Sequence, residues 1–67
     1  MYPDYTCLWI KLLEKDLTKK ELRERAKISS VTLTRLNKNQ FVSMETIGKI
    51  CKVLDCDVGE VLSFKPE

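Results

Sequence analysis

The sequence of 67 residues contains no histidine and only two glycines and two prolines. Without histidine, the commonest general base and neutral metal ligand is missing. Two isolated glycines cannot form a glycine-rich loop that cradles a phosphate. A chain of this length buries one small core and forms one domain, which leaves little room for a catalytic cleft. We therefore expect no enzyme, no cofactor and no metal site.

Membrane-spanning runs and paired cysteines are also lacking. The longest uncharged run, residues 28–34, is far shorter than the ~18 apolar residues that span a bilayer, and the chain does not begin like a signal peptide. The three cysteines, Cys7, Cys51 and Cys56, fit neither a redox C-x-x-C motif nor a zinc site. We interpret them as small hydrophobic residues in a soluble, cytoplasmic protein.

Positive charge, by contrast, is concentrated in one segment. The formal net charge of the chain is +2, but residues 11–38 contain nine Lys and Arg against four Asp and Glu. A surface with this excess is suited to a polyanion such as a nucleic acid. A solvated helical stretch would have the same composition, and from charge alone that alternative is favoured.

A helix-start signal recurs along the chain. It consists of a Ser, Thr or Asp cap, an apolar residue just before it and another four residues after it. The caps are Thr18, Ser29, Ser43 and Asp57, with a weaker start at Asp4. Glu21 and Glu60 stand three residues after two of these caps, which completes two capping boxes. Strand signals are nearly absent outside residues 61–64, so the sequence predicts an all-α, five-helix single domain over residues 1–67.

Apolar side chains in two of the predicted helices recur at the spacing of one helical face. The stripes are Tyr5, Leu8, Trp9, Leu12 and Leu13 in the first helix and Met44, Ile47, Cys51 and Leu54 in the fourth. We expect both stripes to face the core. Gly48 lies beside the second stripe in mid-helix, where glycine is unfavourable, and therefore predicts the close approach of a neighbouring backbone.

The second and third predicted helices span residues 19–26 and 30–38, and only residues 27–29 separate them. So short a connection predicts a sharp helix-turn-helix corner. Its inner side would be closed by Leu22, Ala26, Ile28, Leu33 and Leu36. Such corners also occur in proteins that never contact DNA, so the outer face of the third helix must decide the function.

The outer stripe of the third helix contains no acidic residue. A helix that enters the major groove needs such a face, because carboxylates would meet the negatively charged phosphates. We predict four base-reading residues, namely Ser30, Val31, Thr34 and Arg35. A guanidinium binds guanine O6 and N7, hydroxyls bond to base edges, and a valine methyl contacts a thymine methyl. For Arg35 the alternative is an exposed arginine that pairs with Glu45 or with nothing.

Further residues are predicted to contact phosphates. Lys38 stands near the end of the third helix, and Lys19 stands at the start of the second, where the helix dipole also favours anions. For Lys19 alone, a solvated lysine is the favoured alternative. Ser29 is first of all a cap, although the backbone N–H groups beside it can receive a phosphate.

The segments LTKKELRERAKISSVTLTRL (17–36) and VSMETIGKICKVLDCDVGEVL (42–62) together resemble the lambda-repressor-like (Cro/cI, Xre-type) DNA-binding domain. The resemblance covers residues 5–64. It implies a compact five-helix bundle with a helix-turn-helix at helices two and three. It also implies a sequence-specific, double-stranded DNA-binding transcriptional regulator, a repressor, that reads the major groove with helix three.

The resemblance also assigns roles to individual positions. It places base reading on Ser30, Val31 and Arg35, with Thr34 beside them, and phosphate contacts on Lys19, Lys38, Asn39 and Gln40. Two departures stand out. The family commonly has glutamine in place of Lys19, and it usually has glycine in place of Lys27 because the turn needs a positive φ. Lys27 should therefore adopt a left-handed conformation.

The expected partners are double-stranded DNA and a second copy of the chain. A single module of this kind buries only ~600–1,000 Å² on DNA, so specific binding should need a homodimer on two half-sites. A first hypothesis for the dimer interface is Val58, Val61, Leu62 and Phe64, and the alternative is that these side chains complete the core. The rival function is a protein-interaction module, such as an antitoxin or adaptor that holds a protein partner.

Overall fold

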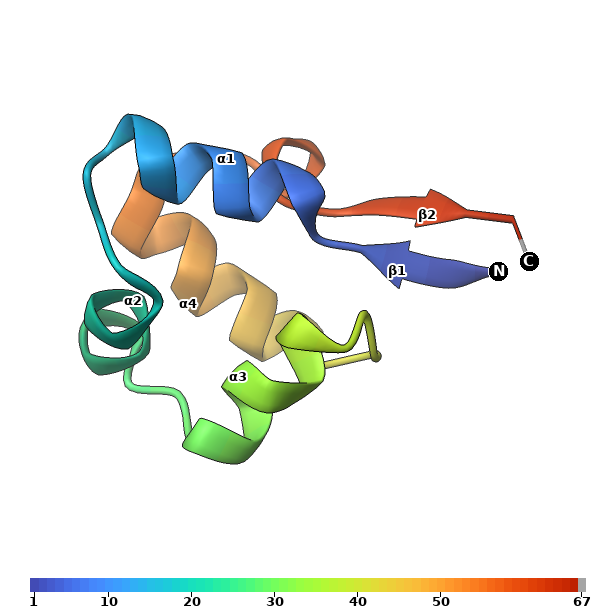
Figure 1. Cartoon of the computed structure of the whole chain (residues 1–67), viewed down its shortest axis with the longest axis horizontal. Helices are drawn as coiled ribbons and strands as arrows, with labels where there is room; N and C mark the ends of the chain where they lie inside the picture. Colours follow the sequence, from blue (N-terminus) through green and yellow to red (C-terminus); the bar gives the residue numbers. More distant parts are fainter. Residues whose placement is uncertain (67) are drawn as a thin grey trace.

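Four α-helices form a small bundle from which a two-stranded sheet projects at one end (Figure 1). This computed structural model describes residues 1–66. The helices are α1 (Thr6–Glu14), α2 (Lys19–Ala26), α3 (Ser30–Asn37) and α4 (Met44–Leu54). A single 3-10 turn, η1 (Val58–Glu60), follows α4, and strand β1 (Tyr2–Asp4) pairs antiparallel with β2 (Ser63–Lys65).

The starts predicted for three of the helices are confirmed. The side chains of Thr18, Ser29 and Ser43 each accept the backbone N–H three residues further on, at 3.1 Å. Each cap satisfies one of the N–H groups that a helix start leaves without a partner. At Thr18 the capping box is complete, because its own N–H donates to Glu21 Oε1 at 3.1 Å.

The prediction of a fifth helix is wrong. The cap at Asp57 does form, and its N–H donates to Glu60 Oε2 at 2.8 Å, but the turn ends at Glu60. Residues 63–65 instead extend to pair with β1. The backbone groups of these residues therefore bond across the sheet, and a fifth α-helix has no length in which to form.

The sequence did not predict the two-stranded sheet, although its one strand signal, at residues 61–64, overlaps β2. Tyr2 lies opposite Lys65, Pro3 opposite Phe64 and Asp4 opposite Ser63. Strands of three residues give no alternating pattern, and a sheet with only two edge strands tolerates a proline. Asp4 still serves the start of α1, since its Oδ1 accepts the Thr6 N–H at 3.2 Å and the Thr6 hydroxyl at 2.7 Å.

The buried core joins all four helices to the segment after α4. Its members are Tyr5, Leu8, Leu12, Leu22, Ala26, Ile28, Leu36, Ile47, Ile50, Leu54 and Val61. Two residues predicted for it are exposed instead, Leu13 at 81% and Met44 at 67%. Leu13 lies one residue past Leu12 and so about 100° further round α1. Met44 is the first residue of α4, where the bundle no longer covers the helix.

Two further expectations about small residues are also corrected or refined. A Cβ atom at Gly48 would meet no atom within 4 Å, so no backbone approaches closely there. Cys51 and Cys56 pack beside the core as expected, and burial raises the pKa of the Cys51 thiol. Cys7, however, is exposed. Within residues 1–66, no helix is long and apolar enough to cross a membrane.

Candidate nucleic-acid interface

The corner between α2 and α3 is a tight turn that forms as the sequence predicted. Lys27 has a left-handed conformation, with φ 58° and ψ 42°. The N–H of Ile28 donates to the carbonyl of Arg23 at 3.2 Å, and the buried side chain of Ile28 pins the turn to the core. The cap of α3 follows at once at Ser29. The second and third helices are therefore held at a sharp angle, and the predicted helix-turn-helix is confirmed.

Helix α3 lies at the lower edge of the molecule, on the side away from α1 (Figure 1). Its inner face is formed by Leu36, which is fully buried, and by Leu33, which packs against the core. The four predicted base-reading residues, Ser30, Val31, Thr34 and Arg35, are all exposed. Helix α3 therefore carries one buried apolar stripe and one outer stripe that is open to a ligand.

The outer stripe combines three kinds of group. Val31 is an apolar side chain that stays 62% exposed. Arg35 forms no ion pair within residues 1–66, and Glu45, the partner considered for it, pairs with Lys49 at 3.7 Å instead. The Thr34 hydroxyl donates to the carbonyl of Ser30 at 2.9 Å. Thr34 therefore offers a base edge an acceptor and a methyl group, and its donor is used inside the helix.

Lys19 makes contacts that the sequence did not predict. Its Nζ donates to Asn37 Oδ1 at 2.7 Å and lies 4.2 Å from the centre of the Trp9 ring. The ammonium thus joins α1, the first residue of α2 and the last residue of α3. Hydrogen bonding and a cation–π contact both stabilise this arrangement. An ammonium has three donors, so it can still receive a phosphate while it holds Asn37.

The three residues predicted to contact phosphates after α3 are exposed and follow the helix directly. Lys38 is the C-cap of α3, and Asn39 has a positive φ of 54°, a conformation that asparagine tolerates better than most residues. The N–H of Gln40 donates to the carbonyl of Arg35 at 2.9 Å. The structure therefore places all three at the C-terminal end of the predicted recognition helix.

A buried tyrosine holds this loop. The Tyr5 hydroxyl donates to the backbone carbonyl of Gln40 at 2.8 Å, across 35 positions of sequence. Burial raises the pKa of Tyr5 above its ordinary value, so the hydroxyl is a donor throughout the neutral range. The apolar spacing of the first helix predicts Tyr5 only as a core residue. The one sequence signal for this hydrogen bond is a tyrosine at a predicted core position, because a buried hydroxyl needs a hydrogen-bond partner.

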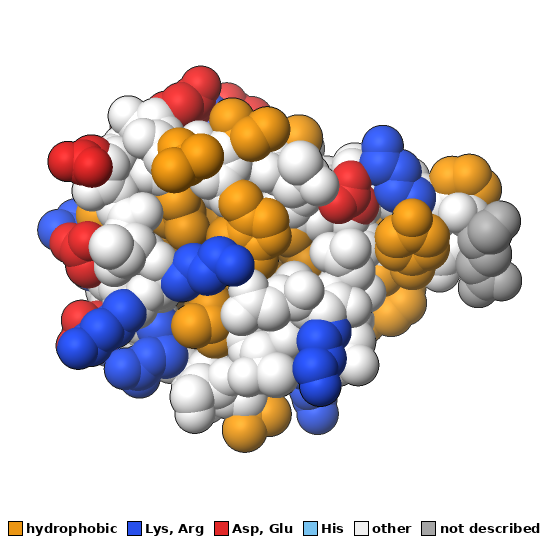
Figure 2. Space-filling model, in the orientation of Figure 1, with side chains coloured by type: hydrophobic (Ala, Val, Ile, Leu, Met, Phe, Trp, Pro, Cys, Tyr) orange, Lys and Arg blue, Asp and Glu red, His pale blue; other side chains and the backbone are white. Residues whose placement is uncertain are grey.

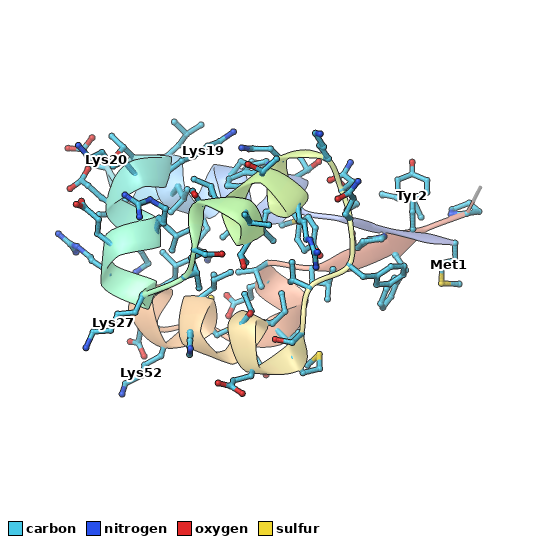
Figure 3. The ribbon with its side chains drawn as sticks, turned by 90° about the horizontal axis from the view of Figure 1, so that it is seen from below. Met1, Tyr2, Lys19, Lys20, Lys27 and Lys52 are labelled. Carbon is cyan, nitrogen blue, oxygen red and sulfur yellow. The ribbon has the colours of Figure 1, made fainter. Side chains whose placement is uncertain are left out.

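Cations also gather around the two ends of α2. Figure 2 shows Lys and Arg side chains mainly over the lower half of the molecule, where α2 and α3 lie. Figure 3 shows Lys19 and Lys20 near the start of α2, and Lys27 close to Lys52 at its other end. A groove of about 410 Å³ lies there between α2 and α4, lined by Arg25, Ala26, Lys27, Lys49, Lys52 and Val53. Lys49 and Lys52 lie outside the basic segment 11–38, so their contribution follows from tertiary contact.

The residues first considered for a dimer interface divide into two groups. Val61 is fully buried and Leu62 packs against the core, so these two complete the fold. Val58 is 37% exposed and Phe64 is 53% exposed. Of these four residues, only Val58 and Phe64 are exposed enough to contact a partner.

Comparison with known proteins agrees with this architecture. The sequence matches the family described as Cro/C1-type HTH DNA-binding domain over residues 7–67. The chain is also similar to the crystal structure of the transcriptional regulator VanUg (form II), with 38% sequence identity and a TM-score of 0.96 over 98% of this chain and 88% of that chain. No curated protein matches the chain significantly. The family match includes the whole corner, the outer stripe of α3 and the loop after it, and we conclude that the chain belongs to the Cro/C1-type HTH DNA-binding domain family.

Proposed function

We propose that the protein is a sequence-specific, double-stranded DNA-binding transcriptional regulator of the cytoplasm that inserts α3 into the major groove. The observation that carries this proposal is the outer stripe of α3, which is exposed, free of acidic residues and held by a confirmed helix-turn-helix. Membership in the family supports DNA as the ligand. The similar solved structure is that of a transcriptional regulator, which supports regulation as the outcome.

In this proposal the base contacts come from the first two turns of α3. Arg35 donates to guanine O6 and N7 as a bidentate pair, and Val31 contacts a thymine methyl. Ser30 donates or accepts at a base edge, while Thr34 accepts because its hydroxyl proton is bonded within α3. These contacts differ between base pairs in the major groove, so they supply the sequence preference.

Phosphate contacts flank these residues on both sides. Lys38, Asn39 and Gln40 receive the backbone of one strand, and Lys19 with the start of α2 receives the other. Near Ser29 the phosphate would meet main-chain N–H groups, since the serine oxygen already accepts from Thr32 at 3.1 Å. These contacts orient α3 and provide affinity for any sequence.

A single copy has a small footprint, so the regulator acts as a homodimer on two half-sites. Repression is the expected outcome because a protein bound across a promoter excludes other proteins from the same stretch of DNA.

The competing function is a protein-interaction module, an antitoxin or adaptor, in which the basic surfaces face an acidic protein.

Selection from random duplexes tests the proposal, followed by fluorescence anisotropy on the selected and on a scrambled duplex at two salt concentrations. A regulator should prefer the selected duplex by about a thousandfold or more and should lose affinity steeply as salt rises. Binding that is weak and indifferent to sequence would contradict the proposal and favour the interaction module.

A further inference from the structure

Two of the three cysteines come together at the end of α4. Cys51 lies in the last turn of the helix, and Cys56 is the second residue after it. Asp55 between them has a left-handed conformation, with φ 51° and ψ 53°, and reverses the chain. The N–H of Cys56 therefore donates to the carbonyl of Cys51 at 3.1 Å. In helix ends that are closed by this bond, the side chains of the two joined residues frequently contact each other.

Spacing along the chain gives no sign of this pair. In a continuous helix, the side chains of residues five apart point about 140° away from each other. The left-handed cap at Asp55 removes this obstacle, because it ends the helix and returns Cys56 to the turn that carries Cys51. The thiol of Cys56 is there a hydrogen-bond partner of the Cys51 thiol. The fold of the helix end therefore creates a dithiol that the sequence motif does not announce.

The backbone at this helix end meets the distance that a disulfide needs. Two cysteines whose Cα atoms are more than about 7 Å apart cannot be bridged without backbone movement. The 3.1 Å bond from the Cys56 nitrogen to the Cys51 oxygen, together with standard bond lengths, keeps the two Cα atoms within about 7 Å. Both residues pack beside the core and both are half-buried. The sulfur atoms are thus held together by the fold, and neither residue is sealed from solvent.

We infer that Cys51 and Cys56 are a reversible modification site, a dithiol that low-molecular-weight disulfides oxidise to an intramolecular disulfide. Intracellular disulfides of this kind are characteristically transient and redox-sensing. Cys7, an exposed residue in the first turn of α1, is the comparison that the chain itself provides. Neither thiol of the pair belongs to α2 or α3, so the inference does not rest on the proposed function.

The surroundings of the two thiols set the order in which they react. Burial raises the pKa of the Cys51 thiol, and the Cys56 thiol and the carboxylates of Asp57 and Glu60 act in the same direction, so Cys51 holds its proton firmly. The Lys11 ammonium lies close enough to Cys56 to attract its thiolate. Its Nζ is held there by Glu60 Oε1 at 3.4 Å. Because the thiolate and not the thiol is the nucleophile, Cys56 attacks first.

Oxidation proceeds by two thiol–disulfide exchanges, with one small disulfide as the oxidant. The Cys56 thiolate attacks one sulfur of the small disulfide, whose S–S bond breaks, and one small thiolate leaves and takes up a proton. Cys51 then loses its proton to water, and its sulfur attacks the Cys56 sulfur of the mixed disulfide and expels the second small thiolate. The two cysteines together lose two electrons and two protons, which the small disulfide gains as it becomes two thiols. An excess of the small thiol reverses both exchanges.

The disulfide would fix a strained point of the backbone. Asp55 has a positive φ, which is unfavourable for a residue with a Cβ atom. A bond between Cys51 and Cys56 closes around this residue and holds the helix end, from which the chain continues past α1 to η1 (Figure 1). Because the cross-link is compatible with the native helix end and restricts the unfolded chain, oxidation should stabilise the fold.

A redox titration of the folded protein tests the inference. Reduced protein is equilibrated with mixtures of reduced and oxidised glutathione, trapped with N-ethylmaleimide and weighed by mass spectrometry. Peptide mapping of the oxidised wild type should show a disulfide between Cys51 and Cys56, with Cys7 outside it. Cys7→Ser should lose two hydrogen atoms and keep no thiol for alkylation. Cys51→Ser should instead carry glutathione on Cys56, and Cys56→Ser replaces this variant if circular dichroism shows that it does not fold.

The same titration in concentrated urea tests whether the fold brings the thiols together. The equilibrium constant for oxidation of the Cys7→Ser protein by glutathione disulfide should be about tenfold or more larger when the protein is folded than when it is unfolded. By linkage, the oxidised protein should then have the higher Tm.

Three results would overturn the inference. One is a Cys7→Ser protein that takes up glutathione on both remaining thiols and forms no internal disulfide. Another is a Cys7→Ser protein whose thiols stay free in mixtures that modify Cys51→Ser. The third is an equal equilibrium constant for the folded and the unfolded protein, which would show that the helix end does not hold the pair.

Discussion

The helix-turn-helix and the two-stranded sheet differ in where their determinants lie along the chain. In the segment from Thr18 to Gln40, caps, turn and apolar stripe act within a few residues of one another. The sheet joins residues 2–4 to residues 63–65, and the contact between the rings of Phe64 and Phe41 adds a third region of the chain. The sequence predicts the first region because its stabilising contacts join residues that are close in sequence. The second depends on contacts that exist only once the bundle has formed.

The largest expected effect comes from the core that both regions share. Leu36 is fully buried on the inner face of α3. Leu36→Ala should lower the free energy of unfolding by about 2–5 kcal/mol, because it removes buried methyl groups and leaves a cavity. For so small a domain this loss is a large part of the total free energy of unfolding. Urea denaturation measures it, with Leu13→Ala as the exposed control, and equal effects of the two changes would contradict this account of the core.

The next effect separates two roles within the helix-turn-helix. Arg35→Ala should weaken binding to the selected duplex by about 1–3 kcal/mol and relax the preference at one base pair. Lys38→Ala should weaken binding to all duplexes about equally and reduce the salt slope by about 1. Anisotropy and a repeated selection measure both. If selection with the Arg35→Ala protein returned the wild-type motif, Arg35 would not read a base.

One hydrogen bond links the residue after β1 to the loop after α3, and removing a single oxygen atom breaks it. Tyr5→Phe removes the hydroxyl that holds the Gln40 carbonyl and should cost about 0.5–1.5 kcal/mol of stability. Hydrogen exchange of the backbone N–H groups in residues 38–41 should become faster as the loop loosens. Tyr2→Phe is the matched control in β1, because Tyr2 is 41% exposed. Equal exchange rates in the two variants would show that the hydroxyl does not hold the loop.

A smaller effect of the opposite sign is expected at the turn. Lys27 has φ 58°, which is unfavourable for a residue with a Cβ atom. Lys27→Gly should be neutral or stabilising by about 0.5–1 kcal/mol, since glycine relieves this strain but makes the unfolded chain more flexible. Lys49→Gly, in the middle of α4, should instead destabilise by about 1 kcal/mol. A clear drop in Tm for Lys27→Gly would contradict the role assigned to the turn.

The smallest expected effect is a dependence on pH at the start of α2. The backbone N–H of Thr18 holds the pKa of Glu21 below its ordinary value of 4.5. A depressed pKa in the folded state stabilises the protein above pH 4.5, and this contribution is lost as the pH falls through the folded pKa. The Tm difference between the wild type and Glu21→Gln should therefore shrink on going from neutral pH into acid. Glu24→Gln removes the same charge from the same helix without removing a cap; a parallel change in this control would contradict the capping role.

Several residues show why sequence reasoning succeeded unevenly. The caps at Thr18, Ser29 and Ser43 were predicted because a cap needs only its own side chain and an N–H three residues away. Asp57 has the same local signal, yet η1 ends after one turn because the following residues pair with β1. Leu13 and Met44 match the apolar spacing of their helices but are exposed, because the packing of the neighbouring helices decides how much of each helix is covered.

The candidate site divides in the same way. The outer stripe of α3 could be predicted because helical spacing alone separates it from the inner face of Leu33 and Leu36. The stripe contains Ser30, Val31, Thr34 and Arg35. The bond from Lys19 to Asn37 spans 18 positions and depends on how α1, α2 and α3 meet. No pattern along the chain signals such a contact.

The sequence by itself determined the four α-helices and the acid-free stripe of the predicted recognition helix, since each depends on interactions within about one helical turn. The left-handed turn at Lys27 was expected from the resemblance to the family, and the structure confirms it. The tertiary structure alone decided that residues 2–4 pair with residues 63–65, that Tyr5 holds the loop after α3, and that Phe41 and Phe64 come together at the surface. These features join segments that are far apart in sequence. Their geometry forms only when burial of the core offsets the conformational entropy lost as those segments come together.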